Sequence, residues 1–168
     1  MASGYELYLI RHGLAEARGE AWPDDAKRPL TERGTGRVRK SARGLSAIGV
    51  SFDVILTSPL VRARQTADML AGSLDPRPPI VQSEALAPGG SYQALVAELE
   101  KLGRRTRIAL VGHEPGIGEL AAKFAGLRAP LEFKKGAICR IDLDSLPPDG
   151  PGRLRWFLTP KILRALKN

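Results

Sequence analysis

Short apolar runs alternate with longer amphipathic stretches along this chain. That alternation is typical of the strand–helix–strand units that build a parallel sheet. Only the Pro/Gly-rich segment 144–152 separates the last two apolar runs, and this close spacing predicts an antiparallel strand pair. We therefore predict an α/β fold with a mostly parallel sheet. The predicted strands are residues 5–10, 52–58, 80–86, 107–112, 136–143 and 153–158, and the predicted helices are residues 32–48, 59–72, 92–103, 114–126 and 161–167.

The start of the first predicted helix carries mixed signals. Thr31 is a favourable N-cap, and Leu45 and Ile48 fall on the face that we expect to be buried. Gly34 and Gly36 disfavour a helix near its start, because glycine loses more backbone entropy than other residues. The helix is predicted to run to about residue 48.

Composition indicates one domain, residues 1–168, of ordinary globular character, with 43% hydrophobic and 26% charged residues. No apolar stretch approaches the length of a transmembrane helix, and the first residues do not resemble a signal peptide. The single cysteine, Cys139, has no partner for a disulfide or a zinc cluster. We expect a cytoplasmic, monomeric protein without a structural metal.

The net charge of +8 leaves three explanations open. The basic residues are spread along the chain, which favours a solvated basic surface. Attraction of an anionic substrate or acidic partner is the second explanation. Nucleic-acid binding is the least favoured, because only 5% of residues are aromatic and they do not interleave with the basic clusters. We expect neither a nucleic-acid nor a membrane partner.

Candidate chemical groups follow three of the predicted strands. Arg11 and His12 come after the first strand, Ser58 and Arg62 after the second, and His113 after the fourth. Ligand sites of open α/β sheets form beyond the carboxyl ends of the strands, so these groups are expected to converge. For Ser58, which precedes Pro59, we favour the role of a helix cap over that of a ligand.

These residue types suit the binding of a phosphoryl group. Arg11 and Arg62 are permanently charged and offer planar forks of donors, and a helix that begins near residue 59 would add free backbone N–H groups. Gly13 and Gly112 lack Cβ atoms and would let the backbone approach a ligand.

A neutral imidazole in such a site is a candidate nucleophile. Neighbouring arginines disfavour the protonated form of His12, which would stay available to take the phosphoryl group covalently. The arginines and His113 would stabilise charge on the transferring group, and water would then hydrolyse the phosphohistidine. The scheme needs no metal.

Four segments, in this order and spacing, resemble motifs of one family. "LIRHG", "RPLTERG", "ILTSPLVRARQTA" and "LVGHEPGI" are similar to the successive motifs of the histidine phosphatase superfamily, which includes the phosphoglycerate mutases. The short distance between the first two, with "EALAPGG" and "RLRWFLTPKIL", resembles the small SixA-type phosphohistidine phosphatases more closely. The resemblance covers residues 5–166.

The resemblance implies a three-layer α/β/α fold of the phosphoglycerate mutase type and a metal-independent phosphatase without a cofactor. It makes His12 the phosphorylated nucleophile and places Arg11, Arg62 and His113 around the phosphate. The SixA-type branch lacks large insertions over the pocket. The substrate implied is phosphohistidine on a signalling protein, such as a histidine phosphotransfer domain.

The chain departs from the larger family members at the proton donor and after the nucleophile. Glu84 is the nearest positional candidate for the acid that protonates the leaving group, but a surface role is favoured for it. Glu114 is interpreted as a charge at a helix start. Leu14 and Glu16 stand where mutases carry a Ser and an Asn that contact phosphate, which makes mutase activity less favoured.

Two other functions stay open at this point. The first is hydrolysis of a small phosphomonoester by the same site. The second is a phosphate-binding regulator that does not turn over, although the intact set of four core residues speaks against it.

Overall fold

The computed structural model describes residues 4–166, which form one six-stranded sheet in the order β3-β2-β4-β1-β5-β6. The first four strands along the chain run parallel to one another, and β5 pairs antiparallel with both β1 and β6. The predicted mostly parallel sheet and the antiparallel C-terminal pair are therefore confirmed. The strands are β1 (Tyr5–Arg11), β2 (Val54–Thr57), β3 (Ile80–Gln82), β4 (Arg107–Gly112), β5 (Ile138–Leu143) and β6 (Arg153–Leu158).

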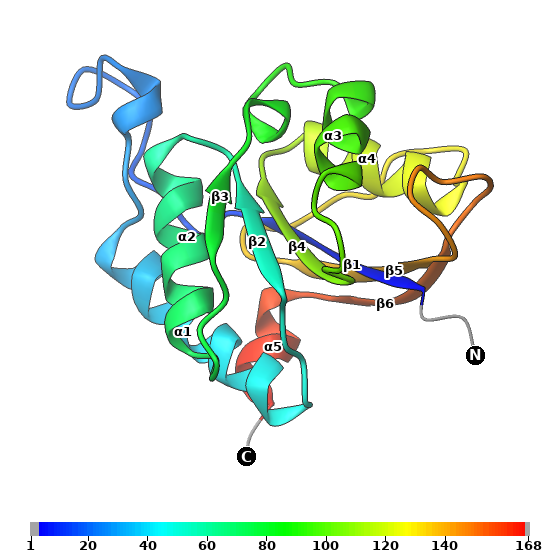
Figure 1. The fold of residues 1–168 in the computed structure, drawn as a ribbon. Helices are drawn as coiled ribbons and strands as arrows, with labels where there is room; N and C mark the ends of the chain where they lie inside the picture. Colours follow the sequence, from blue (N-terminus) through cyan, green and yellow to red (C-terminus); the bar gives the residue numbers. More distant parts are fainter. Residues whose placement is uncertain (1–3, 167–168) are drawn as a thin grey trace.

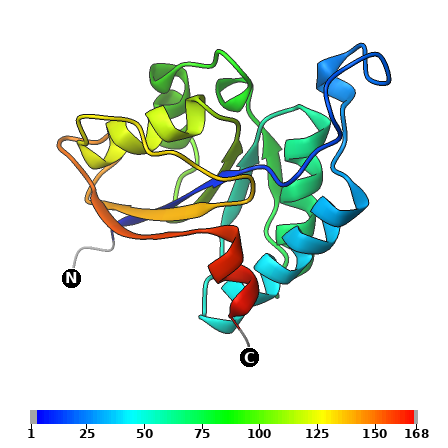
Figure 2. The same ribbon diagram turned by 180° about the vertical axis from the view of Figure 1, so that it is seen from behind.

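Helices cover both faces of this sheet, giving three layers (Figures 1 and 2). One layer contains α1, α2 and α5, and the other contains α3 and α4. None of the helices in residues 4–166 is long and apolar enough to cross a membrane. The helices are α1 (Glu32–Ala47), α2 (Val61–Gly72), α3 (Tyr92–Glu100), α4 (Gly116–Ala125) and α5 (Pro160–Ala165), and the 3₁₀ turns are η1 (Asp25–Lys27) and η2 (Glu84–Leu86).

The central strand β1 holds the two layers together. Leu7 and Leu9 belong to the core beneath α3 and α4, whereas Tyr8 and Ile10 belong to the core beneath α1, α2 and α5. All four are at most 2% exposed, and burial of each such side chain contributes roughly 1.5–3 kcal/mol. Because apolar side chains anchor both faces, the end of β1 is a rigid place for a functional group.

Helix α1 begins as predicted, since the Thr31 hydroxyl accepts a hydrogen bond from Gly34 N at 2.8 Å. The prediction that Ile48 is buried is wrong, because its side chain is 47% exposed. The helix ends at Ala47, and the chain reverses at Gly49, whose φ is +77°. Ile48 therefore lies in the turn and not on the apolar face of the helix.

Two predicted boundaries near the second strand are also wrong. The segment 80–86 is not one strand, because β3 ends at Gln82 and η2 follows. Strand β3 pairs with only three residues of β2, which ends at Thr57, so no partner strand exists for a longer β3. Helix α2 begins at Val61 with Leu60 at its N-cap position, not with Ser58 as its cap.

Gly34 has a specific steric reason to be glycine. A Cβ atom at Gly34 would lie 2.0 Å from the carbonyl oxygen of Leu14, a backbone atom just beyond the end of β1. Gly36, two residues along the same helix, has no atom within 4 Å of the same position. The glycine that weakens α1 in isolation therefore lets the helix pack closely on the segment after β1.

We predict that Gly34→Ala and Gly36→Ala change stability in opposite directions. Gly34→Ala should lower the free energy of unfolding by about 2 kcal/mol or more, because the backbone of residue 14 must shift. Gly36→Ala should raise it by about 0.5–1 kcal/mol through helix propensity. Urea unfolding of both variants tests this, and equal effects of the two substitutions would contradict the close packing.

Candidate active site

Three strand ends bring the candidate residues together at one edge of the sheet. His12 N donates a hydrogen bond to Gly112 O at 3.1 Å, and Ser58 N donates to Val111 O at 3.0 Å. The imidazole ring centroids of His12 and His113 are 5.0 Å apart, with the ring planes at 56°. The two histidines thus belong to one site, although 100 residues separate them.

His12 is buried, and its tautomer follows from one contact. Its Nδ1 lies 2.7 Å from the carbonyl oxygen of Gly13, which can only accept, so Nδ1 carries the proton. The Nε2 lone pair is then free. Burial lowers the pKa of His12 to about 3, and the positive charges of Arg62 and Arg11 add smaller effects in the same direction. The expected neutral imidazole is therefore favoured, chiefly by burial and only secondarily by the arginines.

His113 is also buried and is held by Ser58. Its Nε2 lies 2.7 Å from the hydroxyl oxygen of Ser58. Burial, followed by the charge of Arg62, lowers the pKa of His113 to about 4. The Ser58 hydroxyl also accepts from Leu60 N at 3.2 Å, within the turn before α2. The sequence had suggested that Ser58 caps the helix. In the structure Ser58 instead positions His113.

Arg62 is 2% exposed and is fixed by a residue that sequence analysis missed. It donates to the backbone oxygen of Asp25 at 2.8 Å and to the Asp25 carboxylate at 3.0 Å. The same carboxylate accepts from Arg28 at 2.9 Å. Asp25 lies in η1 of an irregular loop, where no periodicity marks it, and only the pair of acidic residues at 24–25 offered a signal.

Arg11 is held from the opposite side of the site. Its guanidinium donates to the backbone oxygen of Phe133 at 2.8 Å, in the segment that follows α4. Burial lowers the pKa of Arg11, and the negative charge of Glu114 opposes that effect. The two arginines therefore reach the site from different layers and are fixed separately.

Buried donors without partners gather on these residues. Among the described residues, four buried side-chain polar atoms have no hydrogen-bond partner, and three of them are Arg11 Nε, Arg62 Nε and His113 Nδ1. The fourth, Ser83 Oγ, lies outside the set of predicted site residues. Buried donors are nearly always satisfied in folded proteins, so such a group suits a site that receives an anion.

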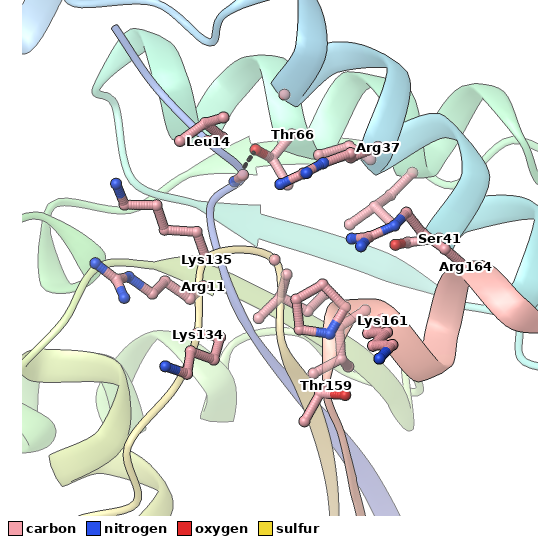
Figure 3. Close-up of a pocket in the computed structure, with 18 residues that line it drawn as sticks. Arg11, Leu14, Arg37, Ser41, Thr66, Lys134, Lys135, Thr159, Lys161 and Arg164 are labelled. Carbon is pink, nitrogen blue, oxygen red and sulfur yellow. Dashed lines mark hydrogen bonds between the residues drawn. The ribbon is translucent and has the colours of Figure 1, made fainter. Parts of the chain in front are cut away.

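Gly13 packs closely on α1, and the idea that it lets the backbone approach a ligand stays a prediction. A Cβ atom there would lie 2.6 Å from Cγ2 of Val38 in α1. Gly13 N donates to the Thr66 hydroxyl at 3.1 Å, drawn as a dashed line in Figure 3. Thr66 in turn donates to Arg62 O at 2.8 Å. Thr66 therefore links the backbone after His12 to the helix that carries Arg62, and it is a second residue that sequence analysis missed.

Neither acidic candidate makes a hydrogen bond or ion pair with the side chains of His12, Arg11, Arg62 or His113. Glu84 is exposed at the first residue of η2, and its carboxylate makes no hydrogen bond or ion pair with a described residue. Glu114 accepts from Gly118 N at 2.9 Å, in agreement with its expected place at a helix start. In residues 4–166, no group of three or more His, Cys, Asp or Glu side chains could hold a metal ion.

Sequence comparisons find known proteins that are similar to this chain. Residues 7–88 match the sequence model of the histidine phosphatase superfamily (branch 1). The chain is 27% identical to the phosphohistidine phosphatase SixA of Escherichia coli K12, over 96% of this chain and 98% of that protein. It is 45% identical to an uncharacterized protein of Picosynechococcus, over 71% of this chain and 73% of the relative.

Solved structures give the same result for the fold. The structure of the protein histidine phosphatase SixA complexed with tungstate superimposes with a TM-score of 0.83 at 28% identity. The match covers 94% of this chain and 99% of the other. The predicted phosphoglycerate mutase-like fold is thereby confirmed.

The buried histidines predict a loss of stability at mildly acidic pH. In the unfolded chain both histidines bind a proton near pH 6.5, whereas in the folded protein they do so at about 3 and 4. The unfolded state therefore binds more protons below pH 6.5, and stability falls as the pH falls from there. Each histidine should contribute a slope of up to about 1.4 kcal/mol per pH unit.

Urea unfolding between pH 6.5 and 4.5, above the range where carboxylates dominate, measures this slope. His12→Gln should reduce it, and its effect on the slope should resemble that of His113→Gln. An NMR titration in which the Cε1–H resonance of His12 shows that the imidazole of the folded protein protonates near pH 6.5 would refute the argument.

Proposed function

Because this chain belongs to the histidine phosphatase superfamily, in its SixA-type branch, and is a phosphatase, we propose that it acts through a phosphohistidine at His12. We propose further that its substrate is phosphohistidine on a signalling protein, such as a histidine phosphotransfer domain in the cytoplasm. No metal enters the scheme.

The first step uses the free lone pair of His12. Nε2 attacks phosphorus, the bond between phosphorus and the leaving group breaks, and the electron pair of that bond goes to the leaving group. The imidazole ring becomes positively charged, and the carbonyl of Gly13, 2.7 Å from Nδ1, stabilises that charge. Water then attacks the phosphohistidine and releases inorganic phosphate, which returns His12 to its neutral form.

The three unsatisfied donors carry this proposal. Arg11 Nε, Arg62 Nε and His113 Nδ1 reach the site from three different segments and are buried. Ser58 Oγ accepts from Leu60 N and has one proton to donate. We infer that the hydroxyl donates this proton in a hydrogen bond to His113 Nε2, which accepts it. His113 Nδ1 then carries hydrogen and donates. Phosphoryl oxygens would accept from all three groups, most strongly when charge develops in the transition state.

Two observations favour phosphohistidine over a phosphoester. The first is the similarity to phosphohistidine phosphatase SixA across nearly the whole of both chains. The second is that Glu84, the candidate proton donor, is exposed, and its carboxylate makes no hydrogen bond or ion pair with a described residue. A phosphoester needs a proton on its leaving oxygen, whereas the P–N bond of phosphohistidine is labile and needs less assistance.

The space beside His113 fits a substrate that is larger than phosphate. A cavity of about 420 Å³ adjoins His113 and Gly112, between the segment 85–93 and the start of α4. We propose that the surface of the phosphorylated protein lies against this opening. A small phosphomonoester fits the same cavity, which makes it the second candidate substrate.

The decisive experiment incubates the protein with a histidine phosphotransfer domain labelled at its phosphohistidine, without added metal. We expect wild type to release the label as phosphate and His12→Ala to release none. The intermediate should appear as acid-labile, base-stable label on wild type after rapid quenching. The same preparations are assayed on p-nitrophenyl phosphate.

Each alternative gives a different result. If the protein hydrolyses the small ester through His12 and leaves the phosphohistidine untouched, the proposed substrate is wrong. The proposed phosphoryl transfer through His12 would still stand. Inactivity on both substrates, together with binding of inorganic phosphate, would favour the regulator that does not turn over.

Asp25 is predicted to act as a positioning residue for Arg62. Asp25→Ala removes the carboxylate that accepts from Arg62 and Arg28. We expect kcat/KM to fall about tenfold or more, which corresponds to about 1.4 kcal/mol of transition-state stabilisation. Asp24→Ala is the matched control, because Asp24 caps η1 from an exposed position and does not contact Arg62. Equal losses in the two variants would mean that loop order, and not the contact with Arg62, matters.

A further inference from the structure

A second cavity lies behind the catalytic strand end, on the side of the sheet covered by α1, α2 and α5. Its volume is about 500 Å³, within the range of small-molecule sites. Figure 3 shows it between α1, the segment 134–136 and the start of α5. Of the four residues assigned to the phosphate site, only Arg11 lines this cavity, whereas His12, Arg62 and His113 are not among its described lining residues, so the two sites adjoin at Arg11.

The floor of this cavity is aliphatic. Among its described lining residues there is no aromatic side chain, so a nucleobase would find no ring to stack on. A flexible hydrocarbon body would be accommodated better than a flat ring. The apolar side chains of the floor are Ile10, Leu14, Val38, Leu70 and Ile138.

The rim of the cavity is positively charged. None of the described residues that line it is acidic. Five of the six basic residues, all except Arg11, make no ion pair or side-chain hydrogen bond within the described part of the chain, and Arg11 donates to Phe133 O. The six are Arg11, Arg37, Lys134, Lys135, Lys161 and Arg164.

Two of these cations face the same space from different helices. Figure 3 shows Arg37 of α1 and Arg164 of α5 among the residues that line the cavity. Partial desolvation, and then the like charges of Arg33 and Arg164, lower the pKa of Arg37. Like charges brought together without a counter-charge are relieved by an anion.

We propose that this cavity binds a small amphipathic anion, with an aliphatic chain on the apolar floor and a carboxylate or phosphate head at the Arg37–Arg164 side of the rim. The volume, the aliphatic lining and the uncompensated charge each match one part of such a molecule. The proposal does not depend on the substrate of the phosphatase.

The cavity shares a wall with the catalytic site. Gly13 and Thr66 line it, and their hydrogen bond at 3.1 Å joins the backbone after His12 to α2. The phosphate site is itself cationic, so a test must separate the two. Saturating tungstate, a phosphate mimic, occupies the catalytic arginines, and a carboxylate probe then reports on the second cavity.

The probe is sodium decanoate, well below its micelle concentration, titrated calorimetrically into the full chain with tungstate present. Decanoate should bind at one site, whereas acetate (head without chain) and decanol (chain without charge) should bind at least about tenfold more weakly. In NMR, decanoate should shift the methyl signals of Ile10 and Ile138, which line the cavity. It should leave unchanged those of Ile117, which packs on the opposite face of the sheet.

Charge-reversal variants locate the head group. R37E/R164E should weaken decanoate at least about tenfold. The matched control R39E/R104E makes the same charge change at two exposed residues away from the cavity, and should not weaken it. Arg62→Ala should bind decanoate like wild type, which excludes Arg62 as the partner of the probe.

Three results would overturn the proposal. One is binding of decanol equal to that of decanoate, which would mean that the rim charges do not contribute. Another is equal weakening by R37E/R164E and R39E/R104E, which would mean a general effect of net charge. The third is loss of decanoate binding in Arg62→Ala, which would place the probe in the catalytic site. Phosphatase activity is not a readout here, so failure of this site and failure of the proposed function are distinguishable.

Discussion

The proposed active site depends on one constraint, the burial of a neutral imidazole at the end of β1. Burial alone lowers the pKa of His12 strongly, and the contact between Nδ1 and the carbonyl of Gly13 decides which nitrogen keeps the proton. Both effects require a rigid strand end, which the two cores on either side of β1 provide. A more exposed or mobile histidine would be partly protonated near neutral pH and would lose its nucleophilic lone pair. The packing of β1 therefore determines the chemistry as much as the motif does.

Buried positive charge is the second requirement, and the chain meets it by fixing each arginine separately. Asp25 holds Arg62 from the loop before α1, and Phe133 O holds Arg11 from the segment after α4. Each contact leaves the Nε–H of the guanidinium unsatisfied. The arginines are therefore oriented before an anion arrives, which reduces the entropy that binding must overcome. Asp25 also offsets part of the repulsion between neighbouring cations, since it pairs with Arg28 as well as Arg62.

The sequence predicted those features that depend on a local pattern. It did not predict features that depend on contacts between segments far apart in the chain. The alternation of strands and helices, the start of α1 and the convergence of the histidines follow from periodicity, a Thr cap and the geometry of parallel strand ends. Ser58 resembled a helix cap because Ser-Pro is a common helix start, but its partner His113 lies 55 residues away. Asp25 and Thr66 act through contacts across 37 and 53 residues and carry no pattern of their own. Strand β3 is short because its partner strand β2 ends, and the sequence of β3 does not indicate where β2 ends.

The arrangement of acids and bases bears on which leaving group the site can serve. Asp25 is committed to two arginines, Glu114 accepts from the start of α4, and Glu84 is exposed. No carboxylate among the described residues therefore makes a hydrogen bond to His12 or His113. An alkoxide leaving from a phosphoester would have to take its proton from water, whereas an imidazole leaving from phosphohistidine is far less basic and needs less help. In the proposed mechanism, the geometry that would stabilise charge on phosphorus leaves the leaving group unassisted, and this asymmetry favours a substrate with a labile P–N bond.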